Sequence, residues 1–194
     1  MKEFDLIKAE KAISDLLVAF GQDLQDENIT ETPKRVAKYW AELLEGEKYT
    51  NEEIIKMFDK QFSLPTSNNM VVVGDIPIFS HCCHHLALMF NMKAHIAYIP
   101  KDKVIGLSKV ARIADMVAKR LQLQERICED IAYIMKSILK TDNVAVVIEG
   151  EHGCVAARGI KKIGSLTRTE VLDGQFKTDS VLINRFYSLI EKRG

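Results

Sequence analysis

Apolar residues in the first third of the chain recur three or four positions apart among charged residues. This spacing is typical of amphipathic helices. It predicts three helices, over residues 5–20, 30–46 and 51–62. In the second of these, Thr32 before Pro33 is a helix start signal. We therefore expect residues 1–68 to form an N-terminal helical extension.

From residue 70 the pattern changes to short runs rich in β-branched residues. Strands are predicted over residues 70–79, 86–100, 143–150 and 154–160. Helices are predicted over residues 108–122 and 124–140 and again from about Asp179, and a polar connection over residues 164–176. The order ββααββ over residues 69–194 predicts an α+β domain, with an antiparallel sheet and helices on one face.

Composition restricts the class of protein. The chain has 194 residues and 47% hydrophobic content, enough to bury a core, and its 27 basic residues balance 27 acidic ones. A neutral chain gives no overall argument for nucleic-acid binding, although a local basic pocket is compatible with it. Charges run through the first 20 residues, unlike a signal peptide, and no apolar stretch is long enough to cross a bilayer. We expect a cytoplasmic protein with reduced thiols, in which clustered Cys and His serve as metal or catalytic groups.

Residues 81–85 hold two cysteines and three histidines, out of 4 Cys and 5 His in the chain. Cys82 and His85 are three apart, so a short turn can direct both to one zinc ion. Further ligands can come from His152 and Cys154. Four ligands would make a structural site, and three would leave a position for water. The spacing leaves both readings open. We expect the remaining cysteine, Cys128, to be a core residue of a helix.

Basic residues lie near these groups in the sequence. Arg158 follows Cys154 by four positions, and Lys109 and Arg112 are three apart at a predicted helix start that Ser108 is placed to cap. One reading is a solvated helix start. The other is a phosphate site, in which the cations and the helix N–H groups bind an anion together.

Several long motifs occur in one order along the chain: CCHH, AYIPKDKVIGLSKVARI, RLQLQERI, HGCVAARGI and SLTRTEVLDGQF. With TPKRVAKYWAELLEG near the N-terminus, they resemble the GTP cyclohydrolase I family from about Asn28 to near the C-terminus. The resemblance implies a tunnelling fold and a zinc-dependent conversion of GTP to 7,8-dihydroneopterin triphosphate and formate. It also implies a homodecamer of two stacked five-membered rings, with active sites between subunits.

The resemblance also implies roles for individual residues. The zinc ligands are Cys82, His85 and Cys154, and zinc lowers the pKa of a water that attacks C8 of guanine. His152 is the proton donor and His84 a second acid/base group, while Glu125 binds guanine and Gln124 lies close to the substrate. The triphosphate-binding positions are Lys38, Lys109, Arg112 and Arg158, with Arg35 and Ser108 nearby.

Three positions depart from the family pattern. Cys83 stands where the family has Glu in C-E-H-H, His81 replaces an uncharged residue, and Asn91 precedes Met92 where the family has a turn glycine. We interpret Cys83 as a packing replacement; the alternatives are a rival ligand or altered chemistry. Two other functions stay open: a tunnelling-fold relative that acts on another purine or stops at a ring-opened formamide, and a non-catalytic zinc-stapled oligomer. The motifs indicate neither the downstream pathway nor a feedback regulatory protein.

Overall fold

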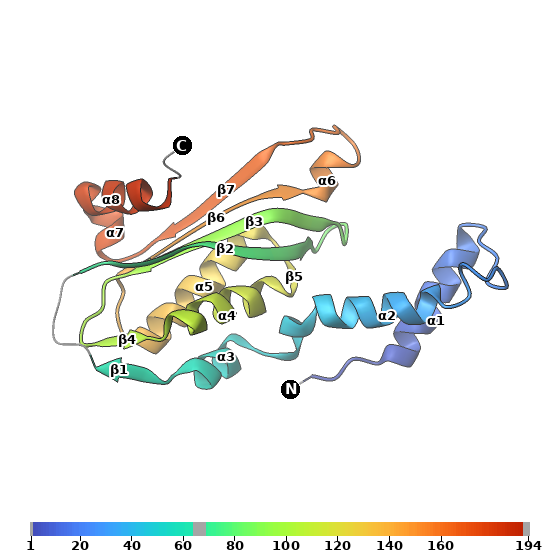
Figure 1. The fold of residues 1–194 in the computed structure, drawn as a ribbon, viewed down its shortest axis with the longest axis horizontal. Coiled ribbons are helices and arrows are strands. Elements are labelled where there is room, and N and C mark those ends of the chain that lie inside the picture. Colours follow the sequence, from blue (N-terminus) through green and yellow to red (C-terminus); the bar gives the residue numbers. More distant parts are fainter. Residues whose placement is uncertain (1, 64–68, 192–194) are drawn as a thin grey trace.

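The structure is a computed structural model that describes residues 2–63 and 69–191 (Figure 1). Its helices are α1 (Leu6–Ala19), α2 (Thr32–Leu43), the 3₁₀ helix η1 (Glu45–Lys48), α3 (Asn51–Phe58), α4 (Leu107–Ala118), α5 (Gln124–Leu139), α6 (Gly153–Ala156), α7 (Gln175–Thr178) and α8 (Ser180–Ile190). Its strands are β1 (Gln61–Ser63), β2 (Val71–Cys82), β3 (Leu88–Tyr98), β4 (Lys103–Ile105), β5 (Leu121–Gln122), β6 (Val144–His152) and β7 (Leu166–Leu172). None of the helices in these described ranges is long and apolar enough to cross a membrane.

The three predicted N-terminal helices are confirmed as α1, α2 and α3. Helices α1 and α2 pack on each other and extend from the body of the molecule (Figure 1). Helix α3 begins with a capping box between Thr50 and Glu53, which satisfies the first N–H groups of the helix. It packs on α5 and places Ile54 and Phe58 in the core. Residues of the predicted extension therefore also contribute to the body.

A five-stranded sheet forms the centre of the fold, with strand order β5-β2-β3-β6-β7. Its neighbouring strands are antiparallel, except that β5 pairs in parallel with the end of β2. This arrangement confirms the predicted α+β architecture. The two-stranded pair β1-β4 was not predicted, because strands of three residues carry too little periodicity to recognise.

The fourth long strand was predicted in the wrong place. Residues 154–160 form most of α6 and a turn instead of a strand, and β7 lies in the segment that was expected to be a polar connection. Gly159 adopts a positive φ of 56°, which a strand does not accommodate. In β7 the threonines and charged residues alternate, as they do in an edge strand with one exposed face. Because β7 has few large apolar residues, the hydrophobic pattern of the sequence does not reveal this alternation.

Helices α4 and α5 cover one face of the sheet, as the sequence predicted. The core between them is apolar, and Cys128 on α5 is buried there, as expected. The other face is covered only in part, by α7 and α8, which pack on a second apolar cluster around Ala145, Phe176 and Phe186 (Figure 1). The rest of this second face carries polar and charged side chains.

Candidate metal centre and active site

The segment between β2 and β3 is fixed by backbone hydrogen bonds at its base. The Cys82 N–H donates to the Ala87 carbonyl at 2.9 Å, and the His85 and Leu86 N–H groups donate back to the Cys82 carbonyl. The Cys83 N–H donates to the Gln122 carbonyl at 3.1 Å, where β5 pairs with the end of β2. These bonds form a tight turn, so Cys82 and His85 are held on one side of it.

Helix α6 brings Cys154 to the same place. Strand β6 ends beside the start of β3, where His152 pairs with Met89. A Cβ on Gly153 would lie 2.9 Å from the Leu88 carbonyl oxygen, so only glycine fits this close approach of α6 to β3. The turn after β2 and the turn after β6 therefore meet at one end of the sheet.

The ligand atoms of Cys82, His85 and Cys154 lie within 4.8 Å of one another, and Cys82 Sγ is 4.0 Å from His85 Nδ1. A tetrahedral zinc ion with these ligands would separate them by about 3.5–4 Å, so small side-chain movements suffice. Two thiols and an imidazole are ligands that zinc favours. The residues therefore fit the ion. The group among the described residues holds these three ligands. The fourth candidate, His152, instead forms a hydrogen bond with Gln124.

Arg158 contacts this cluster directly. Its Nη1 donates to His85 Nε2 at 2.9 Å, so Nε2 accepts and Nδ1 is the nitrogen near Cys82. Burial and the neighbouring Cys82 thiol raise the pKa of the Cys154 thiol, and the positive charge of Arg158 opposes this rise. Binding of an ion by Cys154 would therefore be coupled to release of the thiol proton.

His152 is oriented by Gln124, the first residue of α5. Gln124 is only 1% exposed, and its amide nitrogen donates to three oxygens: Ile148 O, Thr167 O and Thr169 Oγ1. The amide oxygen is therefore the atom that faces His152 Nε2, at 2.9 Å. An oxygen can only accept, so the Nε2 of His152 carries a hydrogen and Nδ1 is free to exchange a proton. The sequence placed Gln124 close to the substrate but gave no signal for this contact.

Burial lowers the pKa of His152, and the negative charge of Glu125 acts in the opposite direction. Glu125 is exposed in the first turn of α5, directly after Gln124. His84 is also exposed, and its ring lies edge-on to that of His85 at 6.3 Å between centroids. The end of the sheet that holds the Cys/His cluster therefore also holds the proposed acid/base and guanine-binding residues.

The other predicted phosphate-binding residues lie elsewhere. Lys109 donates to the Lys60 carbonyl at 2.8 Å, near β1. The first two turns of α4 also carry the exposed Ser108 and Arg112, whereas the end of α4 leads into β5 beside Cys82. A helix rises 1.5 Å per residue, so the start of α4 is about 15 Å farther along than its end. Within the described part of the chain, no hydrogen bond or ion pair joins these residues to the cluster.

The predicted cap of α4 is wrong, and two further predicted phosphate-binding residues lie on α2. Ser108 does not cap α4: the N-cap residue is Gly106, and no side chain caps this end. Arg35 and Lys38 are exposed on α2, which extends from the body. Of the predicted triphosphate-binding residues, only Arg158 contacts the Cys/His cluster within the described part of the chain.

The positions that depart from the family pattern have clear surroundings. Cys83 is half-buried and does not belong to the three-ligand group. His81 is 2% exposed, and its ring packs edge-on against Trp40 of α2 at 4.9 Å. Burial lowers the pKa of His81, which favours the uncharged ring in this contact between α2 and the sheet. Asn91 has a left-handed φ of 50°, at a bulge inside β3 rather than in a hairpin turn.

Comparison with known proteins gives a consistent result. The sequence model of the GTP cyclohydrolase I family matches residues 9–191. The GTP cyclohydrolase 1 of Clostridium acetobutylicum is 53% identical over 184 residues, which cover 93% of this chain and 94% of that protein. The GTP cyclohydrolase 1 of Clostridium botulinum strain Kyoto is 52% identical over 193 residues, covering 97% and 98%. That of Clostridium beijerinckii is 51% identical over 186 residues, covering 93% and 94%.

Proposed function

The chain belongs to the GTP cyclohydrolase I family, and from this premise we propose that it hydrolyses GTP to 7,8-dihydroneopterin triphosphate and formate. The observation that carries the proposal is the convergence of Cys82, His85 and Cys154, beside a histidine held in one tautomer. A zinc site that only stabilises the fold would not require a histidine oriented in this way. Zinc is the cofactor of the family, and the three side chains fit it.

When bound, zinc would make a hydroxide available from water near neutral pH. The protein supplies the remaining groups. His152 is held through its Nε2–H by Gln124, so Nδ1 is the nitrogen that exchanges a proton with the guanine ring. A lowered pKa makes the protonated imidazole a stronger acid, which suits proton donation to a weakly basic ring nitrogen. We assign His84 as the second acid/base group, because it is exposed beside His85.

We assign Glu125 to recognition of the guanine base. A carboxylate accepts two parallel hydrogen bonds, from the guanine N1–H and from the 2-amino group. Adenine offers no such pair of donors. The position of Glu125 next to Gln124 supports the assignment, since it puts the carboxylate one residue from the group that orients His152.

We assign Arg158 to the triphosphate, with Lys109, Arg112, Lys38, Ser108 and Arg35. Binding of a metal ion by His85 Nδ1 would leave the proton on Nε2, which then no longer accepts from Arg158. The guanidinium would be released for an anionic ligand. Arg is well suited to this, because it binds phosphate oxygens in pairs.

We propose that neighbouring subunits supply the distant cations and that the chain works as a decamer of two five-membered rings. Two observations support a shared site: Lys109 at the start of α4 donates to the Lys60 carbonyl near β1, and α2 presents Arg35 and Lys38 on an exposed, projecting helix. In this proposal residues 69–194 carry the catalytic groups, residues 1–68 are an extension that contributes to a neighbouring site, and the protein acts in the cytoplasm.

The test is incubation of the purified chain with GTP, followed by measurement of formate and of fluorescent neopterin after oxidation and dephosphorylation. We expect both products, and about one zinc per subunit by elemental analysis. Cys154→Ser should lose zinc and both products, whereas Cys83→Ser, a matched control in the same loop, should keep them. Ring opening without neopterin would indicate a relative that stops at the formamide. Full zinc content without turnover would indicate a non-catalytic zinc protein.

A further inference from the structure

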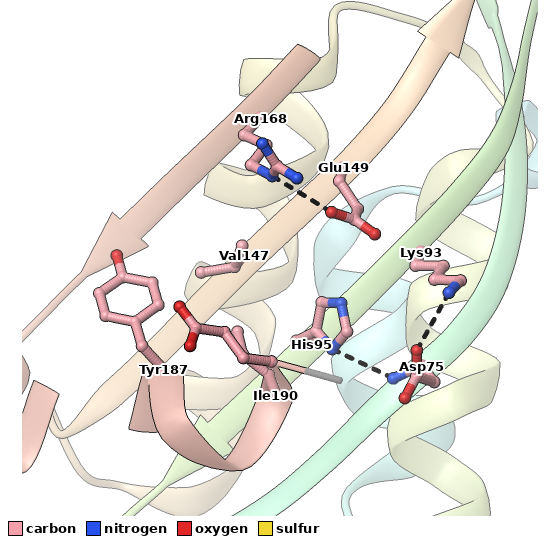
Figure 2. Close-up of a pocket in the computed structure, with 9 residues that line it drawn as sticks. Asp75, Lys93, His95, Val147, Glu149, Arg168, Tyr187 and Ile190 are labelled. Atoms are coloured by element: carbon pink, nitrogen blue, oxygen red, sulfur yellow. Dashed lines mark hydrogen bonds and ion pairs between the residues drawn. The ribbon is translucent and has the colours of Figure 1, made fainter. Parts of the chain in front are cut away.

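A cavity of about 660 Å³ lies on the face of the sheet opposite α4 and α5. Figure 2 shows its residues: side chains from β2, β3, β6 and β7 form the floor, and α8 passes over them. The lining residues on the strands are Asp75, Lys93, His95, Val147, Glu149 and Arg168, and those at the end of α8 are Tyr187, Ile190 and Glu191. None of the residues assigned to catalysis or to GTP lines this cavity.

His95 is the polar group at the centre of the cavity. Its side chain is only 4% exposed, and its Nδ1 accepts a hydrogen bond from the Asp75 N–H at 3.1 Å. An accepting Nδ1 places the ring hydrogen on Nε2 when the imidazole is neutral. Among the residues that the structure describes, none accepts from this Nε2. Figure 2 shows it turned toward the side where Glu149 and Lys93 lie. Because His95 lines the cavity, this N–H is available to donate to an acceptor bound there.

Four of the charged groups that line the cavity form two ion pairs. Lys93 Nζ lies 3.3 Å from Asp75 Oδ1, and Arg168 Nε donates to Glu149 Oε2 at 3.2 Å. Among the described residues that line the cavity, Glu191 included, three are carboxylates and two are cations. An anionic ligand would have to displace an ion pair inside a net negative lining, and a cationic ligand would offer nothing for His95 to donate to. Burial lowers the pKa of His95, with Asp75 and Glu149 opposing and Lys93 adding to the effect, so the environment favours the neutral ring over the charged one.

A neutral ligand with both an acceptor and donors avoids these conflicts. The second carboxylate oxygen of Glu149 has no hydrogen bond to any residue within 2–63 and 69–191, so it can accept from a ligand. Val147 on the sheet and Ile190 on α8 provide apolar walls on opposite sides. The space between a sheet and a helix suits a flat ring, and the volume lies within the range of ordinary small-molecule sites.

We propose that this cavity is a second binding site of the chain, for a heterocyclic lactam of the guanine or pterin kind. The ring carbonyl accepts from His95 Nε2, ring N–H groups donate to Glu149, and the flat ring lies between Val147 and Ile190. The proposal rests on the proposed function only for its choice of probes, because guanine is the base of the substrate and a pterin is the product.

The test is hydrogen exchange followed by mass spectrometry on the full-length zinc-loaded protein, with neopterin and guanosine as probes and adenosine as the matched ring without a lactam. We expect neopterin or guanosine to slow exchange in the peptides of α8 (Ser180–Ile190), and adenosine to have no effect. His95→Phe, which keeps a ring but removes the donor, should weaken the probe at least tenfold, and His95→Gln, which restores an N–H donor, should recover part of the affinity.

A second pair of variants protects the test against loss of folding in the His95 variants. Ile190→Trp fills the cavity from α8 and should abolish the protection, whereas Leu189→Trp, at an exposed position one residue earlier, should not. Formate release from GTP should continue in all four variants, so failure of the second site is distinguishable from failure of the proposed function. Unchanged protection in both His95→Phe and Ile190→Trp, protection by inorganic phosphate instead of the lactams, or no protection by either lactam would each overturn the proposal.

Discussion

Two regions of the molecule differ in how much of each is organised within one chain. They are the end of the sheet that holds the Cys/His cluster, and the start of α4. At the cluster, three ligand atoms converge, and His152 is held by an amide whose nitrogen makes three further hydrogen bonds. At the start of α4, Ser108 and Arg112 are exposed, and Lys109 donates only to backbone carbonyls near β1. This difference supports the proposal that the reacting groups are organised within a subunit and that a neighbouring subunit supplies most of the triphosphate-binding groups.

The largest effect is expected from removing His152, the proposed acid/base group beside the Cys/His cluster. His152→Ala should keep zinc, because His152 is not in the three-ligand group, and should reduce formate release by about 10²–10⁴-fold. Formate per subunit and elemental zinc are the two measurements. The matched control is His81→Gln, which changes a buried histidine near the cluster that contacts only Trp40 among the rings of the described chain. Turnover in His152→Ala equal to that of the unchanged protein would contradict its role.

The completeness of the cluster explains why it could be predicted from the sequence. Its ligands come from two short turns, and five adjacent Cys and His positions are visible without any knowledge of the fold. The contact between Gln124 and His152 could not be predicted in this way. It joins the start of α5 to the end of β6, and it depends on Ile148 and Thr167 to orient the amide. No local pattern encodes a hydrogen bond across 28 positions.

The fold was predictable to a similar degree. Long elements with strong periodicity, such as α5 and β3, were predicted within a few residues. Strand β7 was missed because Thr167, Arg168 and Thr169 are set by their place at the sheet edge rather than by hydrophobicity. The opposite error, a strand at residues 154–160, has the same cause: small apolar residues favour a strand locally, but the close approach of Gly153 to β3 directs the chain into α6.

The second-largest effect tests whether the start of α4 serves another subunit. Lys109→Ala and Cys154→Ser should each be inactive alone, because each removes one half of every site. Mixed oligomers, made by dissociating and reassembling the two variants together, should regain activity at sites that combine an intact cluster with an intact α4. The measurement is formate release as a function of mixing ratio. Lys101→Ala, an exposed lysine outside the predicted set, is the control and should be active alone. Absence of recovery in verified mixed oligomers would show that the sites are not shared.

A smaller effect is expected at Gln124, which positions His152. Gln124→Met should leave three oxygens without their donor and destabilise the fold by about 2 kcal/mol. It should lower kcat more than it raises KM, because orientation of His152 matters most in the reacting complex. Gln124→Glu keeps an acceptor for His152 and adds a negative charge, which raises the pKa of the imidazole. The limb of the kcat profile that requires protonated His152 should then move to higher pH. An unmoved profile with normal kcat would reduce Gln124 to a structural role.

The smallest effect is expected at Cys83, the clearest departure from the family pattern. Its backbone N–H is bonded to Gln122 and its side chain lies outside the three-ligand group, so the thiol has no assigned contact with the metal or with His152. Cys83→Glu, which restores the family residue, should keep zinc and leave turnover within about tenfold, a barrier change of about 1.4 kcal/mol.

The competing interpretation is that Cys83 substitutes for Cys82 as a zinc ligand. In that case Cys82→Ser would retain substantial zinc, and only the double variant with Cys83→Ser would lose it. Adjacent residues direct their side chains apart, and the hydrogen bond between the Cys82 N–H and Ala87 fixes which thiol faces His85. We therefore expect Cys82→Ser alone to lose the metal, and zinc analysis of the two single variants and the double variant decides between the readings.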